Sequence, residues 1–451
     1  MMSPIEDFAA IVARKLVNTK IRGIIRSPQT AVPTQEIMAS ILDVMFWTSI
    51  KTEEGRSIQI RIFYVDPGNP DPNAPPWIRS DRWRIFSLAQ HINFTVSNLV
   101  KLAKAADPWS SGLAVFHTPR AGLFIWGMVD QVIHLSMAIV QEGPGYYTPP
   151  GSFQAIINGA ADITILRQDS FIARLTQNVI IDKQNDCLWE GIISDFLTQW
   201  VKPLWKEAFK MVGNSALTGW RPYWRYEAKE LWAKTLSRIL INIQRQRHGG
   251  AILFCPQELC QDLSVKYEID YRIVPEQMKS LLLDSIRLHH TRDKLEWQRN
   301  GGRRNIPRIL YANESVFQAQ IEDSERSLTG AVKFISSMAG VDGLILASPD
   351  FAIRGFGVEI MTKQDLLELT VTSSANMQDA RKMNATSYGT RHRSMSRYCS
   401  KYPSSLGFVV SQDGDIRAIM KVGEQTVLFE NMKVHSLWGD DVQKMIDASK
   451  S

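Results

Sequence analysis

The sequence is poor in cysteine and contains no long uncharged apolar run. Its 451 residues include 4 cysteines, too few for the disulfide framework of a secreted protein. Cys255 and Cys260 lack a second pair or nearby histidines at zinc-binding spacing, so we expect reduced thiols. No stretch approaches the roughly 18 apolar residues of a membrane span, and the first residues do not resemble a secretory signal. These absences predict a cytoplasmic protein without a membrane partner.

The motifs of several enzyme classes are also missing. The sequence has no Gly-x4-Gly-Lys-Ser/Thr, no His-Glu-x-x-His and no Gly-x-Ser-x-Gly, and Gly355-Phe356-Gly357 lacks the third glycine of a dinucleotide-binding loop. P-loop ATPases, zinc peptidases, α/β-hydrolases and Rossmann dehydrogenases are therefore disfavoured.

The composition is that of a globular protein with two or three domains, because 44% of the residues are hydrophobic and 22% are charged. The net charge of +6 is modest, but its distribution is uneven. Between Ala380 and Gln412 the sequence has no acidic residue and six basic ones: Arg381, Lys382, Arg391, Arg393, Arg397 and Lys401. This window predicts an anionic ligand.

Hydrophobic periodicity predicts a mixed α/β (α+β) protein in three parts. Residues 1–170 are predicted as a β-rich putative sensor domain, and 171–310 as a mainly helical connecting region. In the latter, tryptophans at helical spacing favour core packing over a base-stacking platform. Gly-rich, basic residues 299–308 predict an interdomain linker. Residues 311–451 are predicted as an α/β domain with a mixed central sheet flanked by helices.

Within the last domain, the pattern alternates between helices and strands. We expect a helix over 314–338, a helical or loop stretch over 364–382, and a short helix from Gly389-Thr390 to about Tyr402. The expected strands are 343–347, 352–360, 406–410, 416–422 and 426–429. Asp413-Gly414 is a strong signal for the turn of the first hairpin in the final meander.

Asp342 precedes an apolar strand, where a carboxylate is costly unless it is paired or binds a metal. Asp-Gly also favours an ordinary turn, which is the more usual interpretation of this pattern taken alone. The second segment of interest is Ser387 to Ser394. Gly389 allows close approach of a ligand, Thr390 is placed to cap the following helix, and Arg391 and Arg393 are suited to phosphate oxygens. A capped, solvated basic helix would have the same sequence.

Together, these segments resemble the diadenylate cyclase (DAC, also DisA_N) domain. Asp342-Gly343-Leu344 is similar to its Asp-Gly-Ala motif, and Gly389-Thr390-Arg391-His392-Arg393 matches its Gly-Thr-Arg-His-Arg motif. Ser411-Gln412-Asp413 stands where the family has Ser-Glu-Glu. The resemblance covers about Glu314 to Asn431, and the preceding region is weakly similar to sensor-type regions found ahead of such domains.

The resemblance implies an enzyme that condenses two ATP molecules into cyclic di-AMP, with Mg²⁺ or Mn²⁺ held by Asp342. It implies catalytic roles for Asp342, Arg391, His392 and Arg393. The implied ATP-binding residues are Gly343, Leu344, Gly389, Thr390, Arg391, His392, Arg393, Ser394, Ser411 and Gln412. A homo-oligomer, at least a face-to-face dimer, is also implied, regulated by residues 1–310.

Two departures leave alternatives open. Leu344 replaces the usual alanine and could crowd the site, while Gln412-Asp413 replaces the paired glutamates. One alternative is a nucleotide-binding sensor that has lost catalysis. Another, of a different class, is a nucleic-acid-binding protein that uses the basic window, although no nucleic-acid partner is expected.

Overall fold

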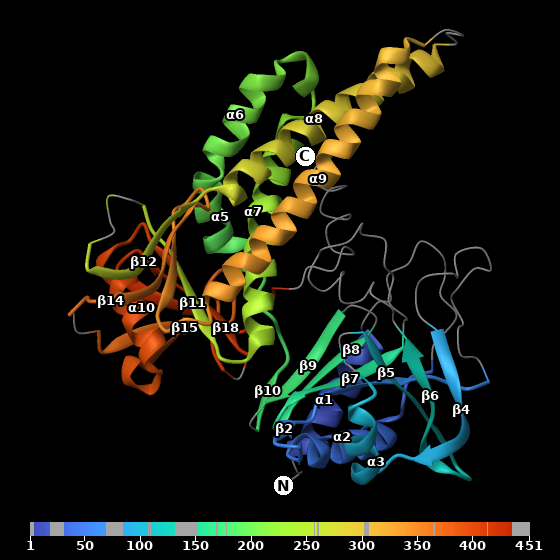
Figure 1. The fold of residues 1–451 in the computed structure, drawn as a ribbon. Coiled ribbons are helices and arrows are strands. Elements are labelled where there is room, and N and C mark those ends of the chain that lie inside the picture. Colours follow the sequence, from blue (N-terminus) through green and yellow to red (C-terminus); the bar gives the residue numbers. More distant parts are fainter. Residues whose placement is uncertain are drawn as a thin grey trace. The chain divides into compact units, whose positions relative to one another are not determined.

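The structure is a computed structural model that describes residues 4–18, 31–68, 84–130 without 107 and 109, and 152–434 without 168–169, 177, 257, 259–260, 302–305, 364–365 and 413. The chain divides after Gln184 into two compact units, each with its own sheet (Figure 1). The mixed α/β fold expected from the sequence is confirmed. Within the described ranges, no helix has both the length and the apolar character needed to cross a bilayer.

The first unit contains an eight-stranded sheet in the order β10-β9-β8-β7-β3-β5-β6-β4. All neighbours in it are antiparallel except β3 and β5. A separate two-stranded ribbon pairs β1 with β2. The strands are β1 (Thr52–Glu53), β2 (Arg56–Ser57), β3 (Ile60–Tyr64), β4 (Arg84–Asn93), β5 (Ser111–Thr118), β6 (Gly122–Asp130), β7 (Phe153–Gly159), β8 (Asp162–Arg167), β9 (Ser170–Thr176) and β10 (Val179–Ile181).

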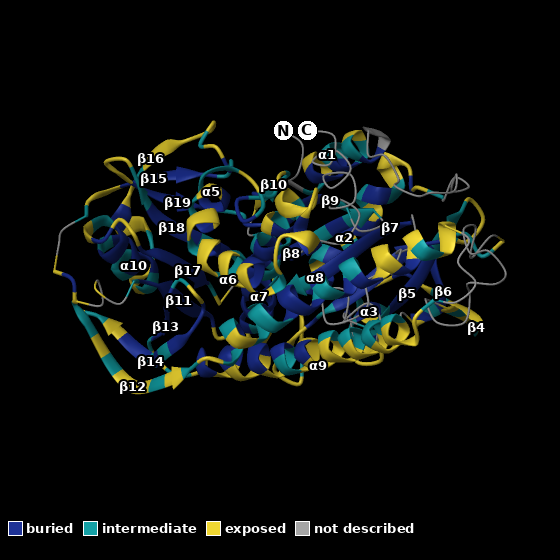
Figure 2. Ribbon diagram, turned by 90° about the horizontal axis from the view of Figure 1, so that it is seen from above, coloured by how far each residue is buried: buried dark blue, intermediate teal, exposed yellow. Residues whose placement is uncertain are grey.

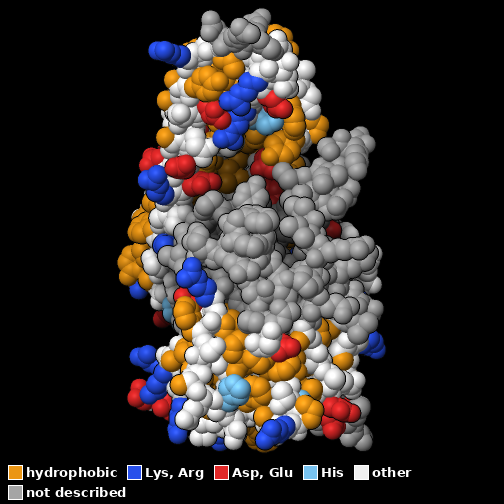
Figure 3. Space-filling model, turned by 90° about the vertical axis from the view of Figure 1, so that its right-hand side faces the viewer, with side chains coloured by type: hydrophobic (Ala, Val, Ile, Leu, Met, Phe, Trp, Pro, Cys, Tyr) orange, Lys and Arg blue, Asp and Glu red, His pale blue; other side chains and the backbone are white. Residues whose placement is uncertain are grey.

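Helices α1 (Pro4–Asn18), α2 (Gln35–Ser49) and α3 (Val96–Ala103) pack on one face of this sheet. Thr34 caps the N-terminus of α2, because its side chain accepts a hydrogen bond from the Ile37 amide. The apolar residues of α2 recur at helical spacing toward the sheet. Edge strand β4 is largely exposed, with Phe86 at 56%. Figure 3 views this side of the unit and shows hydrophobic side chains on its surface.

The second unit is built on a nine-stranded sheet in the order β12-β14-β13-β11-β17-β18-β19-β15-β16. The pairs β11–β13 and β15–β19 are parallel, and the other pairs are antiparallel. The strands are β11 (Gly250–Phe254), β12 (Leu263–Tyr271), β13 (Leu344–Ala347), β14 (Ile353–Ile360), β15 (Glu368–Thr372), β16 (Arg381–Asn384), β17 (Leu406–Val410), β18 (Ile416–Val422) and β19 (Gln425–Phe429).

Helices cover both faces of this sheet, so β11, β13 and β17 are fully buried (Figure 2). One face packs against α10, which contributes Met395 and Tyr398 to the hydrophobic cluster. On the other face, Trp200 and Trp232 contact Phe254. The helices are α5 (Gly191–Trp200), α6 (Lys202–Val212), α7 (Arg221–Gln246), α8 (Ile273–Asn300), α9 (Arg308–Met338) and α10 (Thr390–Lys401), with short 3-10 turns η1 (Ser215–Leu217) and η3 (Ala385–Ser387).

The structure places the domain boundaries differently from the sequence analysis. The boundary at 170/171 falls inside β9, whose hydrogen bonds belong to the first sheet. The boundary at 310/311 divides the second sheet, because β11 and β12 precede it and pair with β13, β14 and β17. The stretch 299–308, of which 302–305 lie outside the described residues, joins the packed helices α8 and α9 rather than two domains.

Two local expectations also need correction. The stretch 364–382 holds strand β15 and the start of β16 instead of a helix or loop, because β15 pairs with β19. Thr390 is the first residue of α10 and does not cap it; Gly389 occupies the cap position, where no side-chain hydrogen bond is found. The expected reduced thiols are free and buried at Cys187, Cys255 and Cys399, whereas Cys260 lies outside the described residues.

Candidate functional site

Two of the segments that the sequence analysis singled out, around Asp342 and Ser411, lie at one end of the nine-stranded sheet, together with the loop before β11. Strand β11 runs parallel to β13 and antiparallel to β17, with Gly250 opposite Val410. The residues just before β11, just before β13 and just after β17 must therefore lie at the same end. They are His248-Gly249, Asp342-Gly343 and Ser411-Gln412.

Gly249 is a point of close approach between the α7–β11 loop, strand β17 and helix α10. Its φ of +69° is unfavourable for residues with a side chain, and a β-carbon there would lie 2.8 Å from the Val410 carbonyl oxygen and 2.9 Å from Nη1 of Arg391. On the other side of this loop, a β-carbon at Gly340 would lie 3.5 Å from Nε2 of His248. The α7–β11 loop thus touches the segments before β13 and at the start of α10.

The turn before β13 holds Asp342 at the surface. Gly343 has a φ of +114°, and a β-carbon there would lie 2.5 Å from the carbonyl carbon of Gly357 on β14. Only glycine fits between the two strands at this point, so backbone packing fixes the path of the chain next to Asp342. Asp342 is exposed. Among the described residues, no group of three or more His, Cys, Asp and Glu side chains is arranged to hold a metal.

Helix α10 directs its N-terminus toward this end of the sheet. Its first amide groups have no partner within the helix, which makes the N-terminus favourable for an anion. Gly389 has a φ of −64°, and a β-carbon there would meet no described atom within 4 Å. The backbone conformation at position 389 does not require glycine, and no described residue would contact a side chain there. The space beside Gly389 is therefore open.

The basic residues near the two ends of the window form ion pairs, whereas those in its middle form none with the described residues. Arg381, Lys382 and Lys401 form ion pairs with Glu430, Glu368 and Asp262. In contrast, the described part of the chain offers no ion-pair partner to Arg391, Arg393 or Arg397. The Nε of Arg393 is buried, and no hydrogen-bond acceptor lies near it in the structure. The uncompensated positive charge is therefore concentrated on α10.

His392 is buried beside Arg417 of β18, with 7% of its surface exposed. Nη1 of Arg417 lies 3.1 Å from Nε2 of His392, and Nη2 donates to Oδ2 of Asp415 at 3.1 Å. Burial, assisted by the charge of Arg417 and then of Arg391, lowers the pKa of His392 to about 4; Asp415 acts in the opposite direction.

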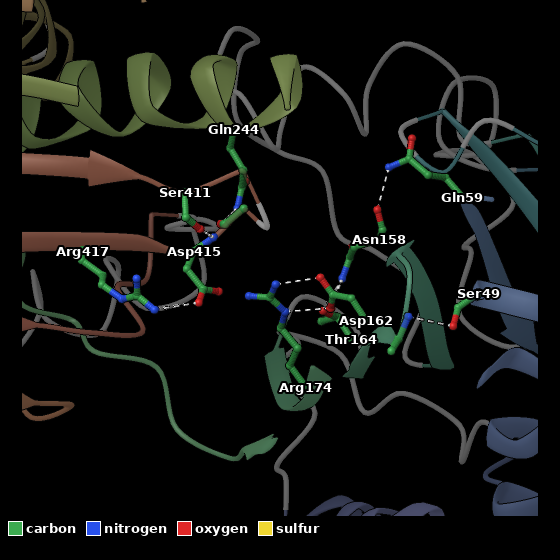
Figure 4. Close-up of polar contacts among 12 residues, drawn as sticks. Ser49, Gln59, Asn158, Asp162, Thr164, Arg174, Gln244, Ser411, Asp415 and Arg417 are labelled. Carbon is green, nitrogen blue, oxygen red and sulfur yellow. Dashed lines mark hydrogen bonds and ion pairs between the residues drawn. The ribbon is translucent and has the colours of Figure 1, made fainter. Parts of the chain in front are cut away.

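The β17–β18 turn is held by its own hydrogen bonds (Figure 4). The Ser411 side chain accepts from the Asp415 amide at 3.0 Å, and the Ser411 amide donates to the Asp415 carbonyl at 2.8 Å. Gln244 at the end of α7 donates to the carbonyl of Gly414 at 2.6 Å. Gln412 is exposed, and Asp413 of the predicted turn lies outside the described residues. Ser411 thus has a structural contact in addition to any contact with a ligand.

The side chains of two predicted binding residues, Leu344 and Ser394, are occupied by contacts within the protein. The Leu344 side chain is 7% exposed and belongs to the hydrophobic cluster beneath α10. Only its backbone remains available, so the expected crowding of the site by this side chain does not occur. Ser394 is half-buried, and its hydroxyl donates to the Arg391 carbonyl of its own helix at 3.2 Å.

The sequence analysis missed the residues that connect these segments. His248 and Gly249 precede a strand that was assigned to a different domain, although Gly-Gly before an apolar run was a visible signal for close backbone approach. Arg417 lies on the predicted strand 416–422 and Asp415 directly precedes that strand, so their opposite charges two positions apart could have identified them as a pair. Nothing in the sequence indicates that Arg417 meets His392.

Comparison with known proteins gives one match, which lies in the first unit. Residues 27–130 match the family described as a probable sensor domain, DACNV. No curated protein and no solved structure matches the chain. The first unit therefore contains a region similar to a probable sensor domain, whereas the candidate site lies in the second unit.

Proposed function

We propose that residues 185–434 form a diadenylate cyclase, which joins two ATP molecules into cyclic di-AMP and releases two pyrophosphates. The observation that carries this proposal is the meeting, at one end of one sheet, of Asp342, the N-terminus of α10 and the β17–β18 turn around Gly249. The match of residues 27–130 to DACNV, a sensor domain associated with diadenylate cyclases, supports a regulatory role for the first unit.

The triphosphate would lie against the start of α10. The open space at Gly389, the free first amides and the unpaired Arg391 and Arg393 together suit a multiply charged oxyanion. The buried, unpartnered Nε of Arg393 supports this placement, because an uncompensated buried donor is costly without a ligand. The Ser411 hydroxyl hydrogen remains available to donate to a phosphate.

The donor set fits a divalent metal that arrives with ATP. Mg²⁺ is commonly held by one or two carboxylates together with substrate phosphates, and Asp342 supplies one exposed carboxylate at the end of the sheet where the phosphates are expected. When bound, the Mg²⁺ or Mn²⁺ ion would neutralise charge on the phosphates. Asp342 would hold it and would help to remove the proton of the ribose 3′-hydroxyl.

The chemistry requires mainly positioning. Each 3′-oxygen forms a bond to the α-phosphorus of the other ATP, the bond from that phosphorus to the bridging oxygen breaks, and pyrophosphate leaves. Because one subunit presents one ATP, the symmetric product suits two second units facing each other across a twofold axis. Such a homo-oligomer would bring two Asp342 carboxylates to two ATP molecules.

The main alternative is a nucleotide-binding sensor of the same fold that lacks catalysis. The replacement of alanine by Leu344 gives it little support, because the leucine side chain is packed in the core. The replacement of paired glutamates by Gln412-Asp413 remains in its favour. A nucleic-acid-binding role is weakened by the ion pairs of Arg381, Lys382 and Lys401 and by the burial of Trp224 and Trp232.

The test is direct. The full chain, and separately residues 185–451, should be incubated with ATP and Mg²⁺ or Mn²⁺, and cyclic di-AMP and pyrophosphate measured by chromatography and mass spectrometry. One cyclic di-AMP and two pyrophosphates for each pair of ATP molecules consumed would support the cyclase. ATP binding without product in either protein, under both metals, would favour the sensor.

A further inference from the structure

The guanidinium of Arg417 imposes a protonation state on His392. Arginine has five donors and no acceptor, and its Nη1 lies 3.1 Å from Nε2 of His392. The Nε2 atom must therefore carry the lone pair, which places the single imidazole proton on Nδ1. A doubly protonated ring would bring two cations together without a hydrogen bond.

We infer that Arg417 is a positioning residue that fixes His392 as a neutral imidazole protonated on Nδ1, so that His392 serves the site as a hydrogen-bond donor and neither as a cation nor as a proton acceptor. The identity of the ligand, a nucleoside triphosphate, rests on the proposed function. The protonation state does not.

Besides His392, two residues hold Arg417 in place, Asp415 and Tyr388. Asp415 accepts a hydrogen bond from Arg417 at 3.1 Å, and the side chains of Arg417 and Asp415 are partly buried, with 21% and 23% exposed. Asp415 is fixed in turn by the paired backbone contacts with Ser411. The guanidinium also lies over the ring of Tyr388, 5.8 Å from its centroid. A donor fixed in this way is well suited to select one tautomer.

The groups that face His392 favour the neutral ring. Arg417 of β18 and Arg391 of its own helix oppose a second positive charge, and burial acts in the same direction. Asp415 in the β17–β18 turn acts in the opposite direction, with an effect smaller than that of burial or of Arg417. Tyr388, which precedes the helix and contacts the His392 ring, is neutral because burial raises its pKa. Protonation of Nε2 would also break the contact with Arg417.

This arrangement limits what His392 can do in the reaction. In the described part of the chain, Nδ1 has no hydrogen-bond partner, so Nδ1–H can donate to a phosphate oxygen. It cannot accept the proton of the ribose hydroxyl, because Nδ1 is already protonated and Nε2 faces Arg417. Binding of a triphosphate should then lack the pH dependence that a titrating histidine near pH 6.5 would produce.

The decisive experiment is nitrogen-15 NMR of the full chain with labelled histidine. The sequence has 8 histidines, and His392→Gln assigns the signal. Between pH 5.5 and 8, we expect the shift pattern of a neutral ring protonated on Nδ1. Arg417→Met removes the donor and should switch the ring toward protonation on Nε2 with an ordinary pKa. Arg417→Lys should preserve the original tautomer. Lys421→Met, a cation removed from the same strand, should change nothing.

The inference is overturned if wild-type His392 is protonated on Nε2, if it is a cation at pH 6.5, or if Arg417→Met and Arg417→Lys both leave its signals unchanged. Titration with ATP and with inorganic triphosphate adds the functional arm. From pH 5.5 to 7.5, wild-type affinity should change only as far as the terminal phosphate of the ligand titrates, and Lys421→Met should follow the same curve. Arg417→Met should show an additional severalfold tightening at the acidic end. Absence of ATP binding with the expected tautomer would refute the proposed function and support the role of Arg417.

Discussion

Nη1 of Arg391 donates a hydrogen bond to the backbone carbonyl of His248 at 3.3 Å, across a separation of 143 positions in the sequence. This contact joins the first turn of α10 to the loop that leads into β11. Among the described residues, the guanidinium of Arg391 has no other hydrogen bond or ion pair, and the other donors of the fork remain available. Because the carbonyl belongs to the backbone, the position of Arg391 depends on the path of the loop at Gly249.

Gly249→Ala should therefore impair the site as well as the fold. The positive φ and the close approach of Val410 and Arg391 together should cost about 1–3 kcal/mol of stability, and the shifted guanidinium should weaken ATP binding. Gly213→Ala is the matched control, because Gly213 has a φ of +77° and no described atom near its β-carbon position. Thermal unfolding and calorimetric titration with ATP measure the two effects. Equal ATP affinity in both variants would contradict the role given to the loop.

Asp342→Asn should abolish cyclic di-AMP formation and leave ATP binding largely intact. The substitution removes the carboxylate that would hold the metal but not the basic N-terminus of α10. Glu359→Gln removes another exposed carboxylate from adjacent strand β14 and should retain turnover. The measurements are product formation and equilibrium binding of ATP at saturating Mg²⁺. Wild-type turnover in Asp342→Asn would show that the metal assignment is wrong.

Arg391→Ala and Arg393→Ala should each weaken ATP binding by roughly tenfold or more, since a hydrogen bond to a charged group contributes about 1.5–3 kcal/mol. Lys382→Ala serves as the control, because it removes an equal charge from the same basic window but from an exposed pair with Glu368 at 2.6 Å. Fluorescence titration at constant ionic strength is suitable. Equal losses in all three variants would indicate a general charge effect instead of a specific site.

Leu344→Ala tests whether the departure from the family alanine matters for activity. The side chain is packed in the core, so its truncation should destabilise the second unit by about 2–5 kcal/mol without raising the turnover of the folded protein. Leu346→Ala, in the same cluster and on the same strand, should behave alike. A specific gain in turnover for Leu344→Ala would instead mean that the leucine restricts the site.

Local patterns were sufficient to predict the helix of 314–338 and the meander of β17 to β19, because hydrophobic periodicity determines these elements within a few residues. They were insufficient for β15. Its five residues form a strand because β19 and β16 flank them, and such pairing cannot be read from a short window.

The site was predictable to a similar extent. Asp342 and the Gly389–Arg393 segment have recognisable sequence patterns, and the structure places both near the end of one sheet. The pairing of β11 with β13 joins residues 93 positions apart, Ile252 and Ile345. The placement of His248 and Gly249 follows from that pairing, as the contact of Arg417 with His392 follows from α10 packing on β18. These relationships exist only in the folded chain.

The buried His392 should also make stability depend on pH. Its pKa is lowered from an ordinary value of 6.5 to about 4 by burial and by Arg417. In the unfolded chain the ring gains a proton as pH falls through 6.5, whereas in the folded protein it stays neutral until about 4. The unfolded state then binds more protons, so stability is complete above pH 6.5 and declines between 6.5 and 4.

The expected loss over this window is of the order of 3 kcal/mol, from about 1.4 kcal/mol for each pKa unit. His392→Gln retains an acceptor for Arg417 but does not titrate, so the second-unit transition in urea should depend less on pH in this variant. His91→Gln, at an exposed position of β4 in the first unit, should preserve the wild-type slope. If His392→Gln and the wild type lost stability in parallel from pH 6.5 to 4, His392 would have to be charged in the folded protein, and the contact with Arg417 could not be a hydrogen bond.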